Sequence, residues 1–281
     1  MNIVRPNFLI IGAMKSGTTT LYHHLRVHPQ VFMPANKEPQ FFSDEPMWTR
    51  GFGWYESLFA QAGDAVAIGE ASTDYTKYPL YPHVPERIFH YAPDMKLIYI
   101  LRAPVERMYS HYVHNYYAGR VDGSPAQVLL NDPHYLAVSC YYLQIQQYLA
   151  FFPSDQLKLI VLDDLKHNPR QVMRDVFGFL GVDIEFEPPN VAEKRHVTAH
   201  KAGRDNALMQ ALKRSSFYNG VSARLPLGVK VALNKWLRKP VASPPSMTPE
   251  LFEQLADRLW DDVIELSKLL GRDLSFWLMN K

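Results

Sequence analysis

The chain has 281 residues, 47% of them apolar, and a net charge of +2. This length is within reach of one large α/β domain with a substantial core, so we expect a single domain over residues 1–281. The single cysteine, Cys140, excludes an internal disulfide framework and predicts a cytoplasmic protein, and no apolar run approaches the roughly 20 residues of a transmembrane helix.

The first predicted element is a buried strand that runs into a glycine-bracketed turn. Residues 8–11 are apolar, residues 12–19 contain two glycines and Lys15, and a helix-like segment follows at residues 21–27. A strand, a tight loop and a helix N-terminus can cradle a phosphate, because free backbone N–H groups and the positive end of the helix dipole face the anion. The sequence therefore predicts a phosphate-binding loop.

The order of residues in this loop differs from that in nucleotide triphosphatases. Their loop reads G-x-x-x-x-G-K-[ST], with the lysine directly after the second glycine. Gly12 and Gly17 have that spacing, but Thr18 stands at the lysine position and Lys15 precedes Gly17. This order disfavours an ATP-binding loop, and a P-loop kinase or nucleotide triphosphatase remains the alternative enzyme class.

A candidate base follows in residues 36–43, where Lys37 and Glu38 precede the aromatic pair Phe41 and Phe42. A carboxylate packed against this pair would be partly desolvated, which would raise its pKa and make it a usable base. An ordinary surface Lys-Glu pair is the alternative.

Four aromatic residues come soon after this segment. They could line an acceptor cleft by stacking on a sugar or an apolar surface, or they could belong to the core. These residues are Trp48, Phe52, Trp54 and Tyr55.

Apolar runs alternate with helical patterns along most of the chain. Continuous apolar runs are typical of parallel strands that are covered on both faces. The predicted strands span residues 66–70, 96–102 and 157–162, and the predicted helices span residues 104–117, 141–152, 169–180 and 248–270. The alternation predicts an α/β fold, a central parallel sheet flanked by helices, with ligands at the carboxyl ends of the strands.

Arg102 and Ser110 indicate a second phosphate site. Arg102 closes a buried strand, and Ser110 lies two turns along the following helix. An arginine at a strand end and a hydroxyl on the next helix can grip a phosphate together. With the first loop, they predict a ligand that has two separate phosphate groups. His111 and His114 follow on the same helix as alternative bases, although a polar histidine on a helix surface is the commoner case.

The charge is unevenly distributed. Residues 194–239 contain eleven Lys/Arg and one acid, a local charge of +10. Such a block favours a polyanionic partner, with a solvated basic face as the alternative. Within it, residues 228–239 fit a basic amphipathic helix bearing Trp236. This pattern predicts either peripheral contact with an anionic membrane, at its inner face, or packing of the helix on the domain.

Three motifs in chain order resemble those of the 3′-phosphoadenylyl-sulfate (PAPS)-dependent sulfotransferases, in the branch of the heparan sulfate glucosaminyl N- and O-sulfotransferases and their bacterial relatives. They are Lys15-Ser-Gly-Thr-Thr19, Lys37-Glu-Pro-Gln-Phe-Phe42 and the segment from Leu101 to Ser110. Residues 69–75 resemble the acceptor-side strand end of that family. The resemblance covers nearly the whole chain and implies a single P-loop-type domain.

The resemblance implies transfer of a sulfuryl group from PAPS to a hydroxyl or amine of an acceptor, with 3′,5′-ADP (PAP) as the product. Lys15 would stabilise the leaving phosphate, and Glu38 would deprotonate the acceptor as it attacks sulfur in line. The implied donor contacts are Lys15, Ser16, Gly17, Thr18 and Thr19 at the 5′-phosphate, and Arg102 and Ser110 at the 3′-phosphate. We expect Lys37, Tyr75 and His114 on the acceptor side.

A loop that closes over the donor is also implied, within residues 182–247 and ahead of the C-terminal helix in residues 248–281. Gly203 and Arg204 match the Gly-Arg ending of that loop, and Lys201 is a looser match. The transferred group carries less negative charge than a phosphoryl group, so a lysine can serve without magnesium and we expect no metal.

The expected partner is a carbohydrate, a glycolipid or another small-molecule acceptor, and no nucleic acid. The alternative outside catalysis is a membrane-peripheral nucleotide-binding protein that keeps the fold without the activity.

Overall fold

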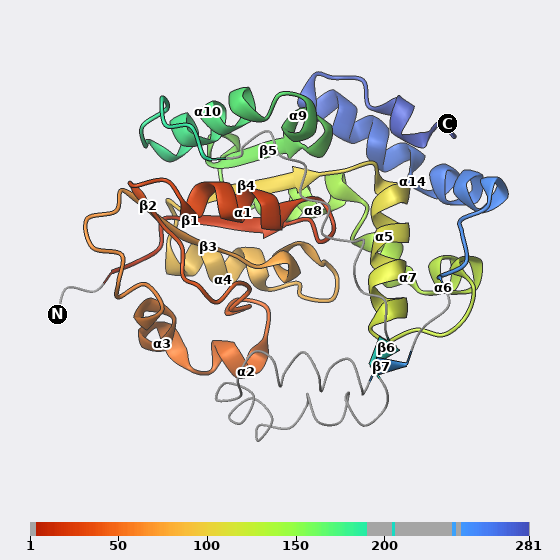
Figure 1. Ribbon diagram of the computed structural model, residues 1–281, viewed down its shortest axis with the longest axis horizontal. Helices are drawn as coiled ribbons and strands as arrows, with labels where there is room; N and C mark the ends of the chain where they lie inside the picture. Colours follow the sequence, from red (N-terminus) through yellow and green to blue (C-terminus); the bar gives the residue numbers. More distant parts are fainter. Residues whose placement is uncertain (1–3, 190–203, 206–237, 240–242, 281) are drawn as a thin grey trace.

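A five-stranded parallel sheet forms the centre of the computed structural model, which describes residues 4–189, 204–205, 238–239 and 243–280 (Figure 1). Every neighbouring pair of its strands is parallel. The strands, in spatial order, are β2 (Val31–Phe32), β3 (Ala67–Ala71), β1 (Phe8–Gly12), β4 (Lys96–Leu101) and β5 (Leu157–Val161). The predicted central parallel sheet is confirmed.

Helices cover both faces of this sheet, and the side chains of β1 alternate between the two layers. Phe8 and Ile10 pack in one core with α1 (Thr18–Arg26), α9 (Leu162–His167) and α10 (Pro169–Leu180). Leu9 and Ile11 pack in the other core, with the helices on the opposite face. Those helices are α3 (Gly51–Ser57), α4 (Val84–Tyr91), α5 (Pro104–Tyr117), α8 (Tyr141–Leu149) and α14 (Pro249–Leu270). Both faces are therefore dry, which explains the continuous apolar runs of the strands.

The helix ends follow the local chemistry of the sequence. Gly181 adopts φ 78° directly after α10, as expected of a glycine that ends a helix. The Thr248 hydroxyl accepts the backbone N–H of Leu251 at 3.2 Å at the start of α14, and Pro249 occupies the first helical position. The predicted helix over residues 141–152 ends earlier, at Leu149.

Short elements that the sequence did not predict complete the fold. They include β2, α4, α2 (Glu45–Trp48), α6 (Pro125–Asn131), α7 (Pro133–Ala137) and the 3₁₀ turns η1 (Thr73–Thr76), η2 (Ser154–Gln156) and η3 (Ser275–Leu278). Trp48, Phe52 and Trp54 are partly buried against the core, and Tyr55 is fully buried within it. Of the two roles considered for these aromatic residues, the core role is the one that their packing supports.

Within the basic segment, residues 194–239, the structure describes residues 204–205 and 238–239. Strand β6 (Arg204–Asp205) pairs antiparallel with β7 (Arg238–Lys239). The predicted helix over residues 228–239 is therefore wrong at its last two residues. Lys239 precedes Pro240, and a residue before proline is restricted to extended backbone. The remainder of that prediction lies outside the described residues. None of the described helices is both long and apolar enough to cross a membrane.

Asp262 joins α14 to the N-terminus of α8. Its two carboxylate oxygens accept the backbone N–H groups of Tyr142 and Leu143 at 3.1 and 3.0 Å. These N–H groups belong to the first turn of α8, which has no partner for them within its own helix.

Replacing Asp262 with Ala should lower the free energy of unfolding by roughly 1–3 kcal/mol, because two partly buried N–H groups lose their acceptor. Urea unfolding at pH 7 measures the change. Replacement of the exposed neighbour Asp261 with Ala is the matched control and should stay within about 0.5 kcal/mol of wild type. Equal stability of the two variants would contradict the role of Asp262.

Candidate active site

The candidate site lies at the carboxyl ends of β1, β3 and β4. These three strands are adjacent and parallel, so the segments that follow them emerge at the same edge of the sheet (Figure 1). The phosphate loop follows β1, Ser72 and Thr73 follow β3, and Arg102 follows β4. Residues that are distant in sequence therefore meet at this edge.

The loop between β1 and α1 has the backbone geometry of an anion site. Lys15 adopts φ 72° and Gly17 adopts φ 96°, both in the left-handed region. Gly17 is the N-cap of α1 and has no side chain to cap the helix, which leaves the N-terminal N–H groups for a ligand. A Cβ at Gly17 would lie 2.7 Å from Leu162 Cδ1, so that side chain would have to shift, and the left-handed φ would strain any residue other than glycine. The loop therefore has the features expected of an anion-binding loop at a helix N-terminus.

Two loop side chains are buried, and the backbone of the loop is contacted by Arg102. Ser16 is fully buried beside the hydroxyl of Tyr141, and Thr18 is buried at the start of α1. Arg102 Nη1 donates to the backbone oxygen of Lys15 at 3.2 Å, while its Nε and Nη2 donate to Glu106 Oε2 at 3.3 and 3.1 Å. The arginine predicted for the second phosphate site thus contacts the loop of the first.

Ser110 lies half-buried on α5, two turns beyond the strand end that carries Arg102. His111, the next residue, is buried, and burial lowers the pKa of its imidazole to about 2, helped by the charges of Arg107 and Lys77. A general base works best with a pKa near the operating pH. His111 therefore does not suit the role of base, and His114 lies half-buried one turn further along α5.

Lys37 links the phosphate loop to Glu38. Its Nζ donates to Thr19 Oγ1 at 2.9 Å, lies 3.5 Å from Thr18 Oγ1 and forms an ion pair with Glu38 Oε1 at 3.3 Å. Lys37 was expected on the acceptor side, but these contacts connect it to the residues proposed for the donor. They also bring the Glu38 carboxylate to the rim of the loop.

Glu38 stands in a constrained turn at the surface of the site. Its side chain is 32% exposed, its carboxylate accepts the Thr73 hydroxyl at 3.4 Å, and its backbone N–H donates to Ala71 at 3.1 Å. Phe41 and Phe42 are fully buried in the aromatic core, where Phe41 stacks on Tyr55 with centroids 4.4 Å apart. The expected contact of the carboxylate with these two rings is replaced by polar contacts with Lys37 and Thr73.

Glu70 is a second carboxylate that the sequence reasoning did not single out. It lies on β3 with 1% of its surface exposed. It accepts hydrogen bonds from the hydroxyls of Tyr75 at 2.7 Å, Ser72 at 2.9 Å and Tyr55 at 3.4 Å. Burial, with a smaller contribution from the charge of Glu38, raises the pKa of the Glu70 carboxyl to about 7 against the opposing effect of these hydrogen bonds.

Tyr75 therefore has a different place from the one expected. The side chain is 2% exposed and its hydroxyl is committed to Glu70. It supports the site from inside and cannot touch an acceptor directly. Of the three residues expected in the covering loop, Lys201 and Gly203 lie outside the described residues, and Arg204 begins β6.

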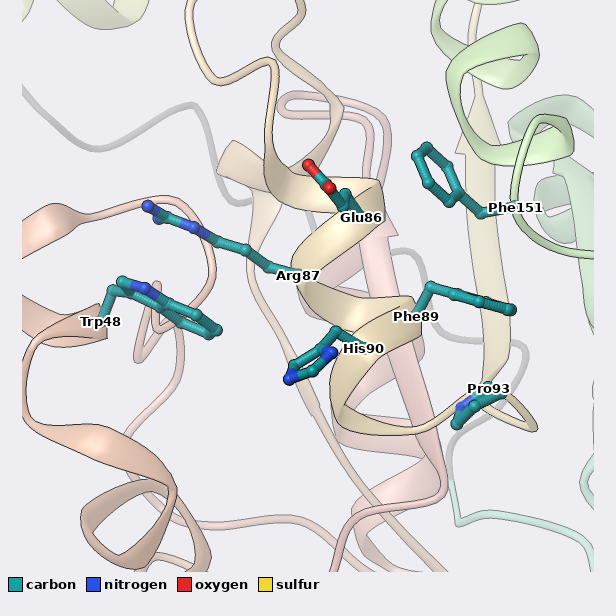
Figure 2. A pocket seen from close by; sticks show the side chains of 7 residues that line it. All are labelled: Trp48, Glu86, Arg87, Phe89, His90, Pro93 and Phe151. Atoms are coloured by element: carbon teal, nitrogen blue, oxygen red, sulfur yellow. The ribbon is translucent and has the colours of Figure 1, made fainter.

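A separate pocket of about 520 Å³ lies beside α4 (Figure 2). It is lined by Trp48, Glu86, Arg87, Phe89, His90, Pro93 and Phe151. The Arg87 guanidinium lies over the Trp48 ring, 4.6 Å from its centroid. Trp48, one of the four aromatic residues considered for an acceptor cleft, lines this pocket, whereas none of the residues predicted for the donor or for the base does. No group of three or more His, Cys, Asp or Glu side chains that could hold a metal ion occurs in the described ranges.

Comparison with known proteins identifies the family. Residues 5–221 match the sulfotransferase domain, so the chain belongs to the sulfotransferase family. A crystal structure of a sulfotransferase from Alicyclobacillus acidocaldarius is 29% identical, with a TM-score of 0.72 over 99% of this chain and 100% of that one. The domain that the chain carries is that of an enzyme that transfers sulfuryl groups, and the match confirms the resemblance inferred from the three motifs.

Curated relatives from animals match a smaller part of the chain. The human bifunctional heparan sulfate N-deacetylase/N-sulfotransferase 2 is 30% identical over 203 residues, which cover 63% of this chain and 22% of that protein. The human heparan sulfate glucosamine 3-O-sulfotransferase 6 is 29% identical over 187 residues, which cover 63% of this chain and 52% of that protein. The chain thus spans between about a fifth and about a half of the length of these relatives.

The raised pKa of Glu70 predicts a pH-dependent stability. An unfolded glutamate has a pKa near 4.5, so the folded protein holds a proton on Glu70 that the unfolded chain has lost between about pH 4.5 and 7. This contribution to the free energy of unfolding is complete below pH 4.5 and is lost as the pH rises through 7, by up to about 3 kcal/mol.

Glu70→Gln should therefore show a smaller fall in the unfolding free energy than wild type between pH 5 and 8, measured by urea unfolding at several pH values. Asp262, whose pKa burial raises to about 6, is present in both proteins and cancels in the difference. Parallel stability curves for the two proteins would show that Glu70 does not titrate in this range.

Proposed function

We propose that this protein transfers a sulfuryl group from PAPS to a hydroxyl or amine of a carbohydrate acceptor. The observation that carries the proposal is the position of Lys37, whose ammonium contacts both Thr19 at the phosphate loop and the Glu38 carboxylate, at 2.9 and 3.3 Å. This contact brings a candidate base to the edge of a loop that fits a phosphate. An isolated phosphate site would have no use for a carboxylate there, since the two would repel each other.

The described residues divide the chemistry between them. Lys15 and the N-terminus of α1 would bind the 5′-phosphate and neutralise the charge that develops on it as its bond to sulfur breaks. Glu38 would take the proton of the acceptor while the acceptor oxygen or nitrogen bonds to sulfur. Lys37 would keep the carboxylate in place and limit its repulsion from the donor. Arg102 and Ser110 would bind the 3′-phosphate.

The acceptor class is inferred from the relatives. The names of two matched human proteins state that they act on heparan sulfate, a polymer that contains glucosamine. A saccharide hydroxyl or amine is weakly acidic and needs a base such as Glu38. We therefore favour a carbohydrate acceptor, free or as the head group of a glycolipid. The order of the phosphate loop, with Lys15 before Gly17, disfavours the kinase alternative.

Glu38→Gln should lower the turnover number at least ~10²-fold, because the amide cannot take the proton of the acceptor. The dissociation constant of 3′,5′-ADP should stay near that of wild type. Labelled sulfate from PAPS, counted on N-desulfated heparan sulfate, measures turnover, and titration calorimetry measures binding. Glu86→Gln, an exposed change on α4, is the control. A near-wild-type rate for Glu38→Gln would move the role of base to another residue.

Lys15→Ala should lower turnover by at least ~10²-fold, since one preorganised cation at the leaving group is lost. It should also weaken binding of 3′,5′-ADP, which Glu38→Gln should not do. Lys166→Ala, which removes a surface lysine paired with Asp163, controls for the loss of one positive charge. Turnover of Lys15→Ala equal to that of this control would refute the assignment.

A metal requirement is not expected, because Lys15, Lys37 and the helix N-terminus supply the positive charge that magnesium provides in phosphoryl transfer. Excess EDTA should leave the rate of sulfate transfer within about twofold of the untreated rate. Loss of activity with EDTA and its return with magnesium would contradict this part of the proposal.

A further inference from the structure

The turn that carries Glu38 has a backbone that needs support. Glu38 adopts φ 62° and Gln40 adopts φ 55°, and the residue between them is Pro39. Residues other than glycine rarely adopt these left-handed angles, and they keep them only where the surroundings impose them.

Two hydrogen bonds fasten this turn to the end of β3. The Glu38 N–H donates to the backbone oxygen of Ala71 at 3.1 Å, and the Gln40 N–H donates to Ser72 Oγ at 3.0 Å. The second bond depends on a side chain, and Ser72 is fully buried. A hydroxyl can rotate, so its lone pair faces Gln40 only if its proton is directed elsewhere.

Glu70 directs that proton. The Ser72 hydroxyl donates to Glu70 Oε2 at 2.9 Å, and the Tyr75 hydroxyl holds the other carboxylate oxygen at 2.7 Å. The partners seen for this carboxyl are hydroxyl groups, and it is 1% exposed. A buried acidic group is costly for a strand, and an apolar side chain at this position would avoid the cost. Its presence calls for a role other than stability.

We propose that Glu70 and Ser72 are positioning residues for Glu38. Glu70 orients the Ser72 hydroxyl, Ser72 holds the Gln40 N–H, and the fixed turn presents the Glu38 carboxylate between Thr73 and Lys37. Neither residue is exposed to reacting groups, so both act through Glu38. This inference rests on the proposed role of Glu38 as the base.

The test is a double-mutant cycle with Ser72→Ala and Glu38→Gln. Ser72→Ala should lower turnover about tenfold. Turnover is measured in two assays: labelled sulfate transferred to N-desulfated heparan sulfate, and labelled sulfate released by hydrolysis of PAPS. The dissociation constant of 3′,5′-ADP should change less than twofold. In the Glu38→Gln background, Ser72→Ala should cause no further loss, because the residue it positions is already gone. Tyr55→Phe, which removes the longest contact of Glu70 at 3.4 Å, is the control and should keep turnover within twofold.

Glu70→Gln provides a second variant of nearly the same shape, and it should repeat the Ser72→Ala pattern. A loss in turnover that persists at full size in the Glu38→Gln background would overturn the inference, and so would an equal weakening of 3′,5′-ADP binding. If Ser72→Ala and Glu70→Gln both kept wild-type turnover while Glu38→Gln was inactive, the positioning role would be overturned. The proposed role of Glu38 as the base would stand. A wild-type rate for Glu38→Gln would instead refute the proposed base.

Discussion

The fold depends on one constraint, which is that β3, β1 and β4 are adjacent and parallel with both faces of the sheet covered. A polar side chain on either face of such a sheet would be buried in an apolar core, which is energetically costly. Polar side chains collect instead at the carboxyl edge, where three strand ends deliver the phosphate loop, Ser72 and Arg102 within reach of one another. The helices on the two faces then fix the loops from both sides.

The same constraint gives two carboxylates opposite surroundings. Glu38 stands outside the edge, 32% exposed and paired with a lysine, whereas Glu70 lies inside the strand with only hydroxyl partners seen. Environment decides what a carboxylate can do, and a group exposed at the edge is open to contact with a ligand. The buried one suits the fixing of neighbouring groups. Two acidic residues in one neighbourhood thus need not share a task.

The sequence was informative wherever a motif is local. A strand, a turn and a helix N-terminus are set by a dozen consecutive residues, so the phosphate loop and the junction at Arg102 could be predicted. Strand β2 has only two residues, and α2, α6 and α7 are too short to show a period, so pattern reasoning passes over them. The contacts of Lys37 depend on how the chain returns from β2 past α1, which no local pattern encodes. Glu70 did leave a signal, namely a carboxylate within an otherwise apolar strand.

The contact between Arg102 and the backbone of Lys15 has a consequence for how a donor would be received. One guanidinium braces the main chain of the loop at one end of the site and stands at the strand end assigned to the other phosphate. A loop braced in this way would lose less freedom on binding, so less of the binding energy would be spent on ordering it. The two phosphates of a bisphosphorylated ligand would bind to parts of one connected unit, the loop and the strand end at Arg102. The distance between these two parts would then select ligands by the distance between their phosphates.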